Sequence, residues 1–274
     1  MKRNGRHLPI VCVINFFLLL LIVIPSFAWC QVTVFVPNTP DIEKKDAAGE
    51  VDILMTMMQP FKNQTFSMDM PQMFAELRFE EGLGNPERKD LLSDIEEIVY
   101  QGKKAWGANI ALEKPGLYQF IMETRPWWDE HKQYYIQQLC KVILPVLGVD
   151  YGWNIPAGLG FEVVPLTRPF GINAPAIFSG KVQFLGKPLP NISVKMGRIN
   201  IEKKPSITHW HEEMAGITNQ TGEFVFLVNQ SGWWFCEAQI PGDPIKGNDG
   251  EMKPVKFGSI LWFYVDSPSN ERKK

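Results

Sequence analysis

The sequence predicts an all-β protein, organised as two antiparallel β-sandwiches in tandem. Apolar residues such as Val182 and Phe184 alternate with polar ones at a period of two, and clusters of Gly, Pro and Asn break the runs. The clearest example is the segment 177–238, where turns at 186–188 and 219–222 join alternating runs into hairpins. No long amphipathic helical pattern interrupts these runs, which favours sandwich layers.

The expected strands follow in order along the chain. Alternating or β-branched runs predict strands over 32–36, 51–57, 73–79, 98–100, 106–112, 117–123, 134–147 and 259–265. The charged stretch 80–97 contains Gly82, Gly84 and Pro86, so we expect a loop there with one helical turn near 90–95.

Pro and Gly residues crowd the stretch 145–175, and such crowding is typical of a connection that few contacts cross. This places the expected boundary between the two sandwiches. The expected organisation is a signal peptide (1–28), an N-terminal β-sandwich (29–160), a Pro/Gly-rich linker (161–175), a C-terminal β-sandwich (176–266) and a polar tail (267–274).

The N-terminus has the pattern of a signal peptide. A basic segment, 2–6, precedes an apolar run over 10–24, which is shorter than the roughly 20 residues that a membrane-spanning helix needs. Small residues at 26 and 28 predict cleavage after Ala28, and cleavage before Gln31 is the alternative. We therefore expect a periplasmic, soluble mature protein. An uncleaved N-terminal anchor and lipidation of Cys30 are the less favoured alternatives.

Charge and cysteine content narrow the classes of partner. Cleavage removes three of the 28 basic residues and no acidic one, which leaves 25 against 30 and a net charge near −5. This balance argues against nucleic acid as a partner, because nucleic-acid binding requires a basic surface. Cys140 and Cys236 both lie in apolar, strand-like runs, so we expect buried free thiols, with a disulfide between them as the alternative.

Several phrases are more specific than strand patterning. They are GKKAW (102–106), KPGLYQF (114–120), RPWWDE (125–130), KVILPVLGVDYGW (141–153) and GFEVVPLTRPFG (160–171), followed by FSGKVQFLGKPLPNISV, TNQTGEFVFLVNQSGWW and KFGSILWFYV. In this order they resemble a family of exported bacterial proteins of unassigned molecular function. That family is often described as the periplasmic accessory component of nickel or cobalt uptake systems. The resemblance covers nearly all of the mature chain and implies a prealbumin-like or carboxypeptidase-regulatory-like (Ig-like) C-terminal sandwich.

The resemblance implies a non-catalytic accessory or binding protein for Ni²⁺ or Co²⁺ uptake, working beside a membrane metal transporter. This chain departs from the family at two positions where members commonly carry His, because Gln31 and Gln59 stand there. An amide is a weak ligand for Ni²⁺ or Co²⁺, whereas imidazole suits both ions. The alternative is therefore an envelope module that binds a protein or a glycan and has lost metal binding.

The densest set of potential metal ligands is His209, His211 and Glu213. If this segment is a strand, alternate residues share a face and the three side chains converge, and a solvated surface segment is the alternative. Six methionines between 55 and 73 are expected to pack in the core, with a Cu(I) site as the alternative. No nucleophile, zinc-protease or phosphate-loop motif occurs, so we expect no enzymatic activity.

Overall fold

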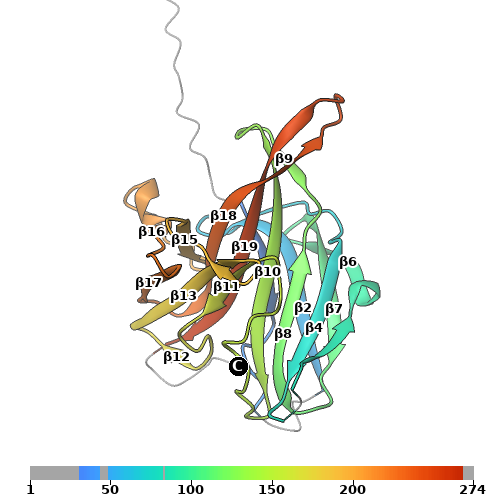
Figure 1. Cartoon of the computed structure of the whole chain (residues 1–274), viewed down its shortest axis with the longest axis vertical. Coiled ribbons are helices and arrows are strands. Elements are labelled where there is room, and N and C mark those ends of the chain that lie inside the picture. Colours follow the sequence, from blue (N-terminus) through green and yellow to red (C-terminus); the bar gives the residue numbers. More distant parts are fainter. Residues whose placement is uncertain (1–30, 44–48, 83, 268–274) are drawn as a thin grey trace, which may run out of the picture.

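The structure is a computed structural model that describes residues 31–43, 49–82 and 84–267 (Figure 1). The expected signal peptide and its cleavage sites before position 31 lie outside the described residues, as do residues 268–274. Among the residues that are described, no helix is long and apolar enough to cross a membrane.

Strands dominate the described part of the chain and form three sheets, which confirms the all-β class. The first sheet has the order β1-β2-β7-β6, with β3 beside β2. Its members are β1 (Val32–Pro37), β2 (Glu50–Gln59), β3 (Gln64–Phe66), β6 (Ile95–Tyr100) and β7 (Lys103–Ala111).

The central sheet has ten strands within the described residues, in the order β16-β15-β18-β19-β10-β8-β4-β5, with β12 beside β19 and β9 beside β10. Its members are β4 (Met73–Phe79), β5 (Glu87–Asp90), β8 (Gly116–Glu123), β9 (Trp127–Asp129), β10 (Tyr134–Val146), β12 (Ile172–Asn173), β15 (Ser193–Arg198), β16 (Met214–Ile217), β18 (Gly232–Lys246) and β19 (Met252–Asp266).

The third sheet contains β13 (Ala176–Phe184), with β11 (Phe161–Pro165) on one side and β14 (Lys187–Pro188) and β17 (Glu223–Val228) also paired to it. Two short 3-10 helices, η2 (Leu92–Asp94) and η3 (His209–His211), complete the described elements. The helical turn expected near 90–95 is confirmed by η2.

Two hydrophobic clusters pack on opposite faces of the central sheet. On β19, Ile260 and Trp262 belong to the cluster shared with the first sheet, whereas Leu261 and Phe263 belong to the cluster shared with the third sheet. Successive side chains of a strand point to opposite faces, which explains this alternation. The result is a sandwich-like arrangement of three layers, in which the central sheet contributes to both cores.

The central sheet also joins the two halves of the chain. β10 pairs in parallel with β19, from Tyr135 opposite Val255 to Val142 opposite Trp262. The stretch 161–175, expected as a linker, instead contains the fully buried strand β11 and the short strand β12, which pairs with β19. The expectation of a linker there is corrected because its alternating segment Phe161–Pro165 has a partner strand, β13, that sequence order does not reveal.

A series of hydrogen bonds connects three buried polar residues on three strands. The backbone N–H and hydroxyl of Thr33 donate to Oε1 of Gln138 at 3.1 and 2.6 Å, and Nε2 of Gln138 donates to Oε1 of Glu237 at 2.7 Å. These residues lie on β1, β10 and β18. Buried polar groups need such partners, so these hydrogen bonds hold the first sheet against the central sheet.

Candidate functional site

Three places in the described structure are candidates for a functional site. They are the segment with the two histidines, the positions of Gln31 and Gln59, and a pocket at the end of β10.

The predicted metal site at His209, His211 and Glu213 is not assembled. His209 and His211 lie on the 3-10 helix η3 and not on a strand, and a helix with 3.0 residues per turn directs alternate side chains about 120° apart. The carboxylate of Glu213 is ion-paired with Lys195 on β15. Within the described residues, no group of three or more His, Cys, Asp or Glu side chains is placed to hold a metal ion.

The segment around these histidines is an ordered loop, residues 199–213, between β15 and β16. The Asn200 side chain donates from Nδ2 to the Lys204 carbonyl at 2.7 Å and accepts from the Lys204 N–H at 3.1 Å. The Ser206 hydroxyl donates to Glu212 at 3.1 Å, and the Thr208 hydroxyl lies 2.9 Å from Nδ1 of His211. Hydrogen bonds within the loop, two of them from the Asn200 side chain to the backbone, therefore hold its conformation.

This loop, held by its own hydrogen bonds, presents large apolar side chains to solvent. Ile207 is 86% exposed and Trp210 is 79% exposed, while the rings of Trp210 and His209 lie 4.3 Å apart. Sequence reasoning had picked out this segment for its histidines. The structure instead makes Trp210 and Ile207 its prominent feature.

The positions of Gln31 and Gln59 come together in the fold. In the antiparallel pair β1–β2, Val32 lies opposite Met58, so the next position outward in the same register brings Gln31 to Gln59. Both residues are half-buried. The amides of Gln31 and Gln59, which the resemblance singled out, therefore lie at the same end of the first sheet.

The methionines and cysteines serve the core. Met55, Met57, Met58 and Met68 are buried in the first cluster, which confirms core packing for these four, whereas Met70 is exposed. Cys140 and Cys236 are buried free thiols, as expected. They belong to different clusters, on opposite faces of the central sheet, which explains why no disulfide joins them.

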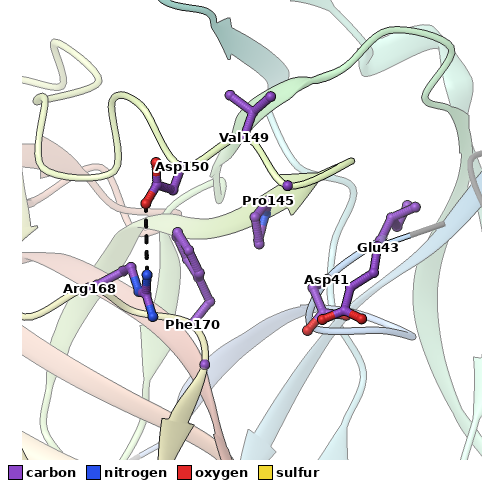
Figure 2. A pocket seen from close by; sticks show the side chains of 10 residues that line it. Asp41, Glu43, Pro145, Val149, Asp150, Arg168 and Phe170 are labelled. Atoms are coloured by element: carbon purple, nitrogen blue, oxygen red, sulfur yellow. Dashed lines mark ion pairs between the residues drawn. The ribbon is translucent and has the colours of Figure 1, made fainter. Parts of the chain in front are cut away.

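A pocket of about 260 Å³ opens where β10 ends (Figure 2). Its walls are the segment Asp41–Glu43, Pro145 with the turn 148–150, and the residues Arg168, Phe170 and Gly171. The wall segment is held by backbone hydrogen bonds, since the Ile42 N–H donates to the Pro145 carbonyl at 3.0 Å and the Leu147 N–H donates to the Ile42 carbonyl at 2.6 Å.

Charged side chains stand on both sides of this pocket. The guanidinium of Arg168 lies over the Phe170 ring at 5.3 Å and faces Asp150, with 3.8 Å between Nη1 and Oδ2. Figure 2 shows the carboxylates of Asp41 and Glu43 close together on the other side. Sequence reasoning did not find this site, because its walls come from three distant stretches. The one signal was the specific phrase PLTRPFG, which contains Arg168 and Phe170.

Comparison with known proteins identifies a family whose function is unknown. The family described as "Domain of unknown function (DUF4198)" matches residues 32–242. No curated protein matches the chain.

Two solved structures share a distant likeness. Red sea bream transglutaminase is 8% identical with a TM-score of 0.21, covering 86% of this chain, which spans only 31% of that protein. The two tandem V-type regions of VCBP3, a v-region-containing chitin binding protein, are 11% identical with a TM-score of 0.23, covering 84% of this chain and 99% of that one. Likeness at this level carries no argument about function.

Proposed function

Because the chain belongs to the family described as a domain of unknown function, DUF4198, we propose its role from the surfaces that it presents. We propose that it is a non-catalytic binding protein of the periplasm that docks another protein through loop 199–213. The observation that carries this proposal is the exposure of Trp210 and Ile207 on a loop that is held by its own hydrogen bonds.

Two physical arguments favour a protein partner at this loop. Tryptophan is enriched among the residues that carry most of the energy of protein interfaces, where a polar rim commonly surrounds an apolar centre. Here the charged residues Lys203, Lys204 and Glu212 lie in the same loop as Ile207 and Trp210. A loop that is already fixed by its own hydrogen bonds loses little conformational entropy on binding, which favours affinity.

A site-specific photo-crosslinker tests the docking role. We expect p-benzoylphenylalanine at position 210 to give a discrete protein adduct in cells, and the same group at position 99 to give none. Val99 is the matched control because it is 78% exposed, against 79% for Trp210, and lies on β6 of the first sheet.

The purified partner then provides the quantitative measurement. We expect Trp210→Ala to weaken its binding at least tenfold and Val99→Ala to leave it unchanged. Identical adducts from both positions, or no adduct from either, would contradict docking through this loop. A glycan bound through Trp210, detected on a glycan array and lost in Trp210→Ala, would replace the protein partner with a sugar.

A second candidate is the accessory role in nickel or cobalt uptake beside a membrane transporter. We infer it from the family resemblance, and one observation favours it: the register of β1 and β2 brings Gln31 and Gln59 to one place. Two imidazoles there would share a metal ion, whereas two amides bind one weakly. In this view the present chain keeps the architecture of the site and has lost most of its affinity.

Calorimetric titration with Ni²⁺ and Co²⁺ tests this second role. We expect the double variant Gln31→His/Gln59→His to bind Ni²⁺ at least tenfold more tightly than the native chain. The gain should fade below about pH 6, because an imidazole with a pKa of about 6.5 must lose its proton to coordinate. The control is Gln31→His/Gln220→His, since Gln220 is exposed in the turn before β17. Equal Ni²⁺ affinities of the two double variants would contradict a metal site shared by positions 31 and 59.

A further inference from the structure

The outer face of the third sheet is an exposed apolar surface that none of the roles above uses. In the pair β13–β17, the inward residues include Phe178 and Phe226, which are buried in the second cluster. The alternate residues point outward, and among them Ile177 is 65% exposed, Val225 63% and Leu227 54%. Three large apolar side chains side by side on one face exceed the scattered exposure that is ordinary for a soluble protein.

The outward residues form three rows across the two strands. From one end of the pair to the other, the rows are Ile177 opposite Leu227, Ser179 opposite Val225, and Lys181 opposite Glu223. The face therefore changes from wholly apolar at one end to oppositely charged at the other. Figure 1 shows β13 and β17 at the side of the molecule away from β6 and β7. A partner for this face must match the order of its rows.

This pattern is complementary to itself about one twofold axis. When two identical sheets pack face to face about an axis parallel to the strands, each row meets the same row reversed, so β13 of one copy lies over β17 of the other. Ile177 then contacts Leu227 of the second copy, and Lys181 faces its Glu223. An axis perpendicular to the strands, through the middle row, would instead place the charged row on the apolar row. The distribution of charge therefore selects the parallel axis.

The middle row can be buried without leaving a polar side chain unpaired. Ser179 already uses its hydroxyl within the chain, because its Oγ lies 2.9 Å from Oγ1 of Thr167. Opposite Val225 of a second copy, this hydroxyl needs no new partner. Leu166, whose N–H donates to the Ser179 carbonyl at 2.9 Å, is a further large apolar residue beside β13 and is 44% exposed.

We propose that a second copy of this chain packs on the outer face of β13 and β17, about a twofold axis parallel to these strands. The contact covers two short strands of each copy, so the dimer is weak and reversible. It shares no residue with loop 199–213 or with Gln31 and Gln59, and it is therefore a separate surface from those of the proposed roles.

Sedimentation velocity of the full mature chain over a concentration series tests the association. We expect monomer at about 1 µM and mostly dimer at about 500 µM, as for a contact of this size. Val225→Lys places a charge in the middle of the face and should weaken the dimer at least tenfold. Val99→Lys is the matched control and should leave the dimer unchanged, because Val99 is 78% exposed but lies on β6 of the first sheet. Circular dichroism verifies that both variants are folded.

Charge reversal tests the direction of the axis. Lys181→Glu gives positions 181 and 223 two negative charges, and Glu223→Lys gives them two positive charges, so each variant alone should associate at least fivefold more weakly. Mixed in equal amounts, the two variants should form a heterodimer as tight as the native dimer, because position 181 of one faces position 223 of the other with the opposite charge. Both chains carry like charges within themselves, so recovery in the mixture cannot come from a contact inside one chain.

Three results would overturn the proposal. The first is a native chain that stays monomeric up to about 500 µM. The second is a Val225→Lys variant that associates as strongly as the Val99→Lys control. The third is a mixture of Lys181→Glu and Glu223→Lys that associates no more strongly than either variant alone.

Discussion

Lys141 on β10 and Glu162 on β11 form an ion pair in which the side chains are only 2% and 1% exposed. The carboxylate of Glu162 also accepts the N–H groups of Ala157 at 2.8 Å and Leu159 at 3.3 Å. One buried pair thus links the central sheet, the third sheet and the long loop before β11.

Removing one member of this pair should be strongly destabilising. We expect Lys141→Met to lower the free energy of unfolding by about 3–5 kcal/mol, because it leaves a buried carboxylate without its cation. Adding Glu162→Gln should restore part of that loss, since the amide is neutral and its oxygen still accepts from the loop. Guanidinium denaturation of the three proteins measures this. A double variant less stable than Lys141→Met alone would mean that the charge of Glu162 is required by the loop.

The two buried thiols should be inert in the folded protein. Burial raises the pKa of Cys140 and of Cys236 well above ordinary values, and only the thiolate reacts with alkylating reagents. We expect iodoacetamide at pH 8 to modify neither residue in the native protein and both in guanidinium, as read by peptide mass mapping. A variant with an exposed thiol, Ser93→Cys, verifies the reagent under native conditions. Rapid native modification of either buried thiol would contradict the packing.

Glu76 on β4 should make stability fall as pH rises. Burial raises the pKa of its carboxyl above the ordinary 4.5, opposed by Lys89, and its Oε2 is buried without a hydrogen-bond partner within the described residues. The folded state therefore keeps this proton to a higher pH than the unfolded chain does. Stability is lost as pH rises from about 4.5 through the raised value.

The variant Glu76→Gln removes this ionisation. We expect it to raise the free energy of unfolding at pH 7 and to have a smaller effect at pH 4. Glu96→Gln, at an exposed position on β6, should show no such difference. Urea denaturation at the two pH values measures both variants, and an equal effect of Glu76→Gln at both would refute the assignment.

The two halves of the chain should not fold separately. Two sandwiches with a boundary in the stretch 145–175 would allow a fragment from Asn173 onward to fold alone. The fragment lacks β10, so β19 loses the partner that pairs with it from Val255 to Trp262, and Trp262 loses the part of the first cluster that precedes Asn173. We now expect no cooperative thermal transition and poor dispersion of amide signals. Cooperative melting of the fragment would show that the third sheet and the C-terminal strands form an independent core.

Local sequence patterns predicted most strands, and their failures have physical causes. β5 was missed because Glu-Arg-Lys-Asp is exposed along its whole length at the edge of the central sheet and has no alternating apolar side chains. The segment from Phe161 to Pro165 was expected as linker because the surrounding Pro and Gly residues outweighed its apolar alternation. The His209–His211 segment is expected on a strand, where alternate side chains share a face, but it forms a 3-10 helix.

Local patterns along the chain are enough to predict the all-β class, the core role of the buried methionines and the burial of both thiols, because these follow from alternation and side-chain polarity along single segments. That one central sheet joins the two halves becomes visible only in the folded protein. The same holds for the meeting of Gln31 with Gln59 and for the placement of Arg168 opposite Asp41 and Glu43. These relationships depend on which distant strands pair, and hydrogen bonding between strands leaves no periodic mark on either sequence.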